Sequence, residues 1–204
     1  MLTLYDMERS GNAYKARLML SLLGLEYSKR TVDLSRKEQL ESWFLAINPL
    51  HMVPVLDDAG MIVCDSAAVL VYLAAKYDAA RTWYPPAPEA MAKVQQWLAY
   101  AGNEILNALA AVRAIGLGLR PGNLAEAQDK ARGVLSHLEA SLTGREWLAA
   151  SHPSIADVAC YPYVALITMG GMTHDAYPAI AAWLKRVEGL KGYIPLPARP
   201  AVKA

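Results

Sequence analysis

A proline-rich segment, Trp83-Tyr84-Pro85-Pro86-Ala87-Pro88, divides the chain into two unlike parts. Three prolines within four residues cannot continue a helix, and they stiffen the segment as a linker. The residues before this segment mix strand-like and helix-like patterns, whereas those after it have helical patterns throughout. The sequence therefore predicts a first domain at residues 1–77, a linker at 78–88 and a second domain at 89–204.

Short strands and helices alternate in the first part. A strand at 1–5, a helix at about 13–23 that Gly24 ends, and a strand at 27–34 form a βαβ unit, whose two strands pair in parallel. A polar helix, two short strands joined by a tight turn, and a last helix follow at about 37–46, 53–56, 61–63 and 66–76. This order, βαβαββα, predicts a thioredoxin-like α/β domain.

The second part has helical patterns alone, and we expect about five helices. The main segments are 89–115, 124–142, 154–169 and 178–189. Within the third, Ser154 and Asp157 have the spacing of a reciprocal helix cap, which indicates a role in folding. The sequence thus predicts an all-α C-terminal domain.

Charge and cysteine content exclude several classes of protein. The net charge of +1 provides no basic field for nucleic acid or an anionic membrane. The apolar stretch at 155–172 contains Asp157 and Pro162 and is short for a membrane span. Cys64 and Cys160 lack the spacing of metal ligands and lie in apolar runs, which favours buried free thiols. With no secretory signal at the start, we expect a cytoplasmic protein without a metal.

The first candidate binding segment is the start of the first helix, Ser10-Gly11-Asn12. A helix start has unpaired N–H groups and a partial positive charge, so it favours an anion. Ser10 places a hydroxyl there. The simpler interpretation, in which Ser10 or Asn12 only caps the helix, is favoured by this segment alone.

Two further segments have the same double interpretation. Val53-Pro54 before a strand is ordinary, but a cis bond there would turn the Val53 backbone toward an extended peptide ligand. Ser66 is a plausible N-cap. Alternatively, Asp65 and Ser66 hold an amino acid head group, with its carboxylate at the helix start and its ammonium against Asp65.

Together these segments resemble the cytosolic glutathione transferase family, in its bacterial, serine-type form. Ser10-Gly11-Asn12, Asn48-Pro49 with Val53-Pro54, Asp65-Ser66 and Ser154 to Asp157 are similar to its motifs, in order and across nearly the whole chain. The resemblance implies that Ser10 donates a hydrogen bond to the glutathione sulfur, with Asn12 sharing that role. Tyr5 is a third candidate, although its strand position favours the core. The glutathione-binding residues implied are Gln39, Met52, Val53, Pro54, Asp65 and Ser66.

The implied chemistry is activation of a thiol. A helix N-terminus and a hydrogen bond lower a thiol pKa by about 2 units, or roughly 2.7 kcal/mol in favour of the thiolate. We expect the second substrate, a small electrophile, between the domains and against the long helix, where the candidates are Tyr100, Asn103 and Asn107. Arg113 and Arg120 either meet an acidic substrate or are solvated.

The segment around residue 51 departs from the family pattern. His51 replaces the usual glycine, and Met52 offers only backbone contacts. This altered segment keeps a non-catalytic binding protein open as an alternative to conjugation. A glutathione-dependent disulfide reductase or peroxidase on the same scaffold is a second alternative. No cysteine lies at the first helix start, which disfavours a redox cycle on a protein thiol. The resemblance also implies a homodimer.

Overall fold

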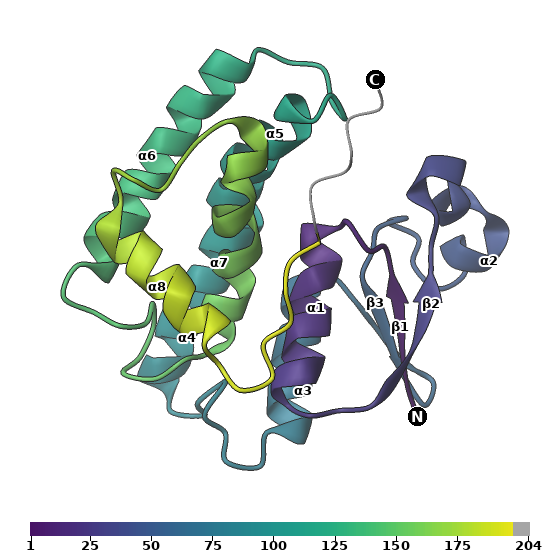
Figure 1. Ribbon diagram of the computed structural model, residues 1–204. Helices are drawn as coiled ribbons and strands as arrows, with labels where there is room; N and C mark the ends of the chain where they lie inside the picture. The colour runs from purple at the N-terminus through teal and green to yellow at the C-terminus, as the bar shows by residue number, and fades with distance from the viewer. Residues whose placement is uncertain (198–204) are drawn as a thin grey trace.

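A computed structural model describes residues 1–197, and its first part is a four-stranded mixed sheet (Figure 1). The order of the strands is β2-β1-β3-β4. β1 pairs in parallel with β2 and antiparallel with β3, which is antiparallel to β4. The strands are β1 (Leu2–Asp6), β2 (Tyr27–Thr31), β3 (Val55–Asp58) and β4 (Met61–Cys64).

Helices cover both faces of this sheet. α1 (Gly11–Leu22) and α3 (Ser66–Tyr77) lie between the sheet and the helical part, and the short α2 (Ser42–Leu45) lies on the opposite side (Figure 1). Gly24, at φ 64°, follows the end of α1, as its position in the sequence predicts. The thioredoxin-like arrangement is confirmed.

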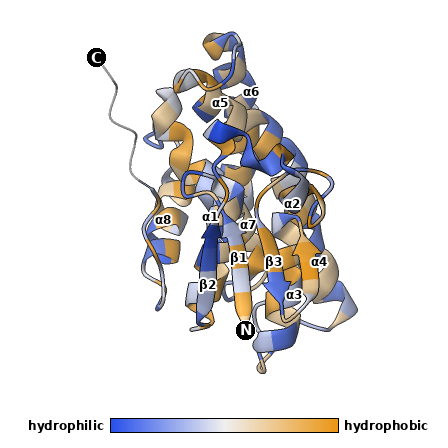
Figure 2. Cartoon of the chain, turned by 90° about the vertical axis from the view of Figure 1, so that its right-hand side faces the viewer, coloured by the Kyte–Doolittle hydropathy of each residue, from blue (hydrophilic) through white to orange (hydrophobic). Residues whose placement is uncertain are grey.

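The region between β2 and β3 differs from the prediction. β2 ends at Thr31 instead of continuing to residue 34, and as an edge strand it is polar, which Figure 2 shows as a blue strand. The predicted helix at 37–46 is wrong. Two single turns of 3-10 helix, Leu34–Arg36 and Glu38–Leu40, precede α2. Lys37 between them has a left-handed backbone, with φ 61°, and an α-helix cannot pass through that conformation.

The second part contains five α-helices within the described residues, in agreement with the all-α prediction. α4 (Pro88–Tyr100) and α5 (Leu106–Gly116) form the expected long helix, joined by a π-helical turn at Ala101–Ile105. The others are α6 (Leu124–Leu142), α7 (Ile155–Ala165) and α8 (Pro178–Glu188). α7 ends before the predicted residue 169 because the chain tightens into a 3-10 turn at Leu166–Gly170.

α7 is the helix on which the two parts meet. Nearly all its side chains are buried, and it contacts α1, α3, α4, α5 and α8. The predicted reciprocal cap at its start is confirmed: the Ser154 N–H donates to Asp157 Oδ2 at 3.0 Å, and Ser154 Oγ accepts from the Ala156 N–H at 3.2 Å. The site described below lies around the contact between α1 and α7.

The limits of the two domains stay a prediction. α3 ends at Tyr77 and α4 begins at Pro88, but their packing against α7 is continuous. Of the predicted second domain, residues 198–204 lie outside the described part of the chain. In the described part, no helix combines the length and hydropathy needed to cross a membrane. Cys160 is buried as predicted, whereas Cys64 is only half-buried.

Candidate active site

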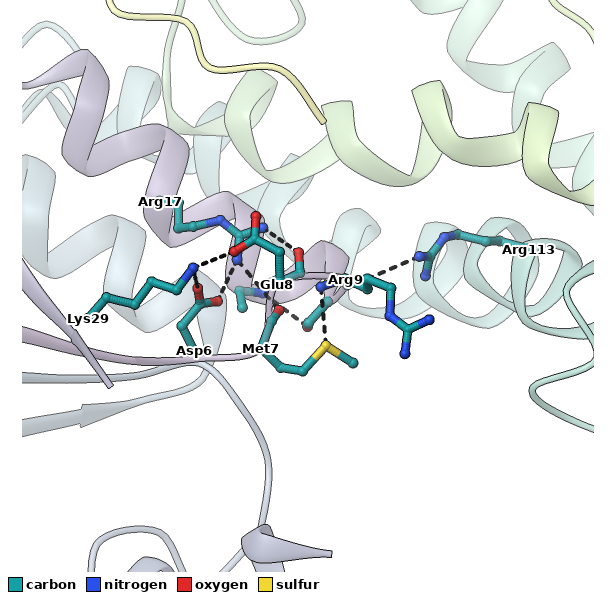
Figure 3. A network of polar contacts seen from close by, with 9 residues as sticks. Asp6, Met7, Glu8, Arg9, Arg17, Lys29 and Arg113 are labelled. Atoms are coloured by element: carbon teal, nitrogen blue, oxygen red, sulfur yellow. Dashed lines mark hydrogen bonds and ion pairs between the residues drawn. The ribbon is translucent and has the colours of Figure 1, made fainter. Parts of the chain in front are cut away.

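The loop between β1 and α1 is held from both parts of the chain (Figure 3). The buried Arg17 guanidinium forms an ion pair with buried Asp6 at 2.5 Å and donates to the Glu8 carbonyl at 2.7 Å. From α5, Arg113 Nη2 donates to the Arg9 carbonyl at 3.0 Å (Figure 3). These contacts fix the backbone that leads into Ser10.

Ser10 caps α1, as the simpler interpretation expects. Its Oγ accepts from the Ala13 N–H at 3.2 Å, and its carbonyl accepts from the Tyr14 N–H at 2.9 Å. A hydroxyl has one donor and two acceptor positions, so the cap leaves the proton of Ser10 available to a ligand. Capping α1 and donating a hydrogen bond to a ligand are therefore compatible roles for Ser10.

Ser10 opens onto a cavity of about 450 Å³, which we call the Ser10 cavity. It lies between the β1–α1 loop, the 3-10 turn after β2, the end of α5, and α7. Two arginines and no carboxylate are among its lining residues, which are Met7, Arg9, Ser10, Gly11, Leu34, Ser35, Arg113, Leu117, Leu119 and Tyr163.

Gly11 lets α7 approach the start of α1. A Cβ added to Gly11 would lie 2.7 Å from two atoms of the Tyr163 ring, closer than packed atoms come. Tyr163 is buried, and this burial raises its pKa. Its phenol is therefore held, neutral, beside the first turn of α1.

A second, smaller cavity lies at the start of α3, and we call it the Ser66 cavity. Its lining residues include Asn12, Lys15, Asp65, Ser66 and Leu98. The start of α1, the start of α3 and the long helix meet there.

The cap of α3 corrects one expectation from the sequence. Asp65, not Ser66, is the N-cap, because its Oδ1 accepts from the Ala67 N–H at 2.7 Å and the Ala68 N–H at 3.4 Å. Ser66 is the first helical residue, and within residues 1–197 its hydroxyl makes no hydrogen bond. Asp65 has φ 73°, which is uncommon for a residue other than glycine. Directly after this unusual backbone conformation, Ser66 lines the cavity.

The Val53-Pro54 bond is cis, as one of the two interpretations of this segment expects. The turn before it is closed by Asn48, whose Nδ2 donates to the Met52 carbonyl at 2.8 Å and whose Oδ1 accepts from the Leu50 N–H at 3.1 Å. Neither bond uses the backbone of Val53. Val53 packs in a small apolar cluster with Met7, which also lines the Ser10 cavity.

The structure brings some of the predicted site residues together and leaves others apart. Ser10 lines one cavity, and Asn12, Asp65 and Ser66 line the other. Tyr5 is core, as expected: it packs against Trp43 and Phe44 and lines neither cavity. Gln39 also lines neither, although its buried Oε1 has no hydrogen-bond partner within residues 1–197. The Met52 side chain is exposed.

The three candidates for the second substrate also lie away from Ser10. The Tyr100 ring packs against His137 of α6, at 5.0 Å between centroids. Asn103 and Asn107 are exposed and bond to each other at 2.9 Å, and Asn107 lines a separate groove between α5 and α6. On this helix it is Arg113, rather than these residues, that reaches the Ser10 cavity.

Sequence reasoning missed Lys15, Tyr163 and the residues at 34–35. Lys15 carried a signal, since a charged residue within a helix expected to be buried on several sides is costly to bury and needs a reason. Tyr163 carried none, because its place beside Gly11 depends on how α7 docks.

A thioredoxin-like domain that presents a capped helix start to a helical domain is the plan of a glutathione-dependent protein. Residues 1–75 match the family described as the glutathione S-transferase N-terminal domain, and residues 121–186 match its C-terminal domain. The chain belongs to the glutathione S-transferase family. Its function is accordingly that of a glutathione transferase.

Individual relatives agree with this assignment. Glutathione S-transferase theta-1 of Bos taurus is 33% identical over 180 residues, which cover 83% of this chain and 75% of the relative. The crystal structure of a glutathione S-transferase from Pseudomonas fluorescens is 32% identical with a TM-score of 0.88, covering 96% of this chain and 98% of that one. A transferase homologue from Drosophila mojavensis, solved with bound glutathione, is 28% identical with a TM-score of 0.86, covering 93% and 88%.

Proposed function

We propose that this chain holds glutathione across its two cavities and activates the thiol at Ser10 for attack on a small electrophile. The observation that carries the proposal is the Ser10 hydroxyl, which caps α1 through its oxygen and keeps its proton for a ligand in the Ser10 cavity. The donor and the helix N-terminus both favour a thiolate over a thiol. Ser10 thereby stabilises the nucleophile and is not itself one.

We propose contacts for the rest of glutathione as well. Asp65 and Ser66 hold the γ-glutamyl head group in the Ser66 cavity, and the Val53 backbone pairs with the peptide. Asn12 lines the cavity of the head group rather than that of the sulfur, which supports Ser10 over Asn12 as the donor to sulfur. Gln39, Met52 and Pro54 complete the proposed set at the glycine end.

The second substrate is proposed to occupy the Ser10 cavity. This places the second-substrate site of the helical domain at Arg113 and Tyr163 instead of at Tyr100, Asn103 and Asn107. The apolar lining suits a hydrophobic body. Arg113 has no carboxylate partner in residues 1–197, and burial lowers its pKa, so a negatively charged group on the substrate would be favoured there. We propose an electrophile that carries an anionic group.

Arg113→Met is expected to reduce kcat/KM for an unsaturated ketone bearing a carboxylate, such as ethacrynic acid, by about tenfold, the size of one charge-assisted contact. The methyl ester cannot make that contact in either protein, so its kcat/KM should fall clearly less than that of the acid, by only what the lost Arg113 bond to the Arg9 carbonyl costs. Steady-state kinetics with both substrates measures this. Arg120→Met is the matched control, since Arg120 is exposed and lines the α5–α6 groove. An equal loss for acid and ester would contradict the charge assignment.

The main alternative is reduction of disulfides or peroxides by glutathione on the same fold. Neither Cys64 nor Cys160 lines the Ser10 cavity, and burial raises the pKa of both thiols, which favours conjugation over a redox cycle on a protein thiol. A third possibility is a non-catalytic binding protein.

Calorimetry with glutathione and assays of two substrates distinguish conjugation, reduction and non-catalytic binding. We expect saturable binding below millimolar glutathione, and faster turnover of chlorodinitrobenzene than of a glutathione mixed disulfide. The reverse order of rates would favour the reductase. Binding without turnover of either substrate would favour the non-catalytic protein, and absence of binding would overturn the proposal.

We further propose a cytoplasmic homodimer of the bacterial, serine-type class with a role in detoxification. Two free thiols fit a reducing compartment. Exposed apolar side chains on the turn before β3 and on edge strand β4 support an interface: Leu50, Met52, Met61 and Ile62. The resemblance to the family supports the bacterial, serine-type class and the role in detoxification.

A further inference from the structure

Lys15 is a buried charge that the activity described so far does not use. It lies on α1 with 3% of its surface exposed and lines the Ser66 cavity. Within residues 1–197 it forms no ion pair and no hydrogen bond, and its Nζ lies 5.5 Å from the centroid of the Tyr163 ring. Buried ammonium groups are ordinarily paired, because removal from water is costly. An unpaired one facing a cavity therefore indicates a missing partner.

Burial lowers the pKa of Lys15 to about 8, and the nearby Asp65 carboxylate opposes that shift. With that pKa, most of the amine is still protonated at neutral pH. Asp65 is already engaged as the cap of α3 and forms no ion pair with Lys15. Within residues 1–197, no carboxylate therefore pairs directly with the Lys15 ammonium.

The polar groups of the Ser66 cavity form two sets. The Lys15 ammonium and the Ser66 hydroxyl and N–H are donors. The Asp65 carboxylate and Asn12 Oδ1, a buried atom with no partner within residues 1–197, are acceptors. Donors for a carboxylate beside acceptors for an ammonium are the complement of a zwitterionic α-amino acid head group.

We propose that Lys15 binds the α-carboxylate of the γ-glutamyl residue of glutathione, together with Ser66 at the start of α3. Asn12 Oδ1 and Asp65 accept from the ammonium of the same head group. This inference rests on the proposed function, because it requires that glutathione place its γ-glutamyl end in the Ser66 cavity. Lys15 is then a specificity residue that separates γ-glutamyl peptides from thiols lacking the head group.

Three ligands and two variants test the assignment by calorimetry on the full chain. The ligands are glutathione, γ-aminobutyryl-cysteinylglycine, which lacks the α-carboxylate, and glutaryl-cysteinylglycine, which lacks the ammonium. Lys15→Met keeps a side chain of similar length without the charge. Lys93→Met, at an exposed site on α4, is the matched control for loss of a lysine.

Lys15→Met should weaken binding of glutathione and of the glutaryl analogue by about tenfold or more, the size expected of a buried charge-assisted contact. Binding of the γ-aminobutyryl analogue should not change, because the group that Lys15 contacts is absent. Lys93→Met should leave all three affinities unchanged. An equal loss for all three ligands in Lys15→Met, or no loss for glutathione, would overturn the assignment. Failure of the wild-type chain to bind glutathione would instead overturn the proposed function.

Thermal melting separates a ligand contact from a structural role. Replacing a buried, unpaired ammonium with an apolar side chain removes a desolvation cost, so the ligand-free Lys15→Met variant should melt at or above the wild-type temperature. Saturating glutathione should raise the melting temperature of the variant less than that of the wild type. A ligand-free variant that melts well below the wild type would show that Lys15 is needed for packing, against the proposal.

Discussion

Ser10→Ala is expected to slow conjugation of chlorodinitrobenzene by about tenfold to a hundredfold near neutral pH. The reason is the loss of one hydrogen bond to an ionised sulfur, worth about 1.5–3 kcal/mol. That bond lowers the pKa of the bound thiol, so its loss raises the pKa and leaves less thiolate at pH 7. The pH profile of kcat/KM should move upward by about 1–2 units. The defect should shrink as pH rises through the new pKa.

Two variants make this result specific. Ser10→Thr keeps both the hydroxyl and the cap of α1, and it should retain the wild-type pH profile. Asn12→Ala should weaken glutathione binding without moving the profile, because Asn12 lines the Ser66 cavity. A shifted profile in Asn12→Ala, with a normal one in Ser10→Ala, would transfer the donor role to Asn12. Melting curves should show only the loss of a cap in Ser10→Ala, about 1 kcal/mol.

Local sequence signals were sufficient for most of the fold. Gly24 marked the end of α1, and the spacing of Ser154 and Asp157 marked the start of α7. Each of these depends on the backbone or on hydrogen bonds within one turn, and such features can be inferred from neighbouring residues. The predicted helix at 37–46 was wrong. The composition of this segment suits a helix, but the left-handed Lys37 is a feature that composition does not encode.

The candidate site was predictable only where a motif marked it. Ser10, Asp65 and Ser66 line the cavities at the helix starts where their motifs placed them. The second-substrate residues depend on which face of the long helix meets the β1–α1 loop. That face is set by the docking of α7 against α1, between residues about 150 positions apart in sequence. Arg113 and Asn103 lie on the same long helix, and no local pattern indicates which of them lines the Ser10 cavity.

The role of Asp157 is expected to be structural, and its loss should have the largest effect on stability. The side chain is 1% exposed and accepts four hydrogen bonds. Oδ2 accepts from the Ser154 N–H at 3.0 Å and its hydroxyl at 3.3 Å. Oδ1 accepts from the Leu148 N–H at 3.1 Å and from Trp183 Nε1 on α8 at 2.9 Å. One carboxylate thus joins the start of α7, the preceding loop and α8.

Asp157→Ala should therefore destabilise the chain by about 3–5 kcal/mol, because it leaves buried donors without an acceptor. For a chain of this size the melting temperature should fall by about 10 °C. Asp129→Ala is the matched control: the Asp129 side chain is 73% exposed and, within residues 1–197, pairs with Arg132 alone, so its effect should be below about 0.5 kcal/mol. Below its melting temperature, Asp157→Ala should retain the wild-type pH profile, since Asp157 lines neither cavity. A normal melting temperature with a lost or shifted pH profile would contradict a purely structural role.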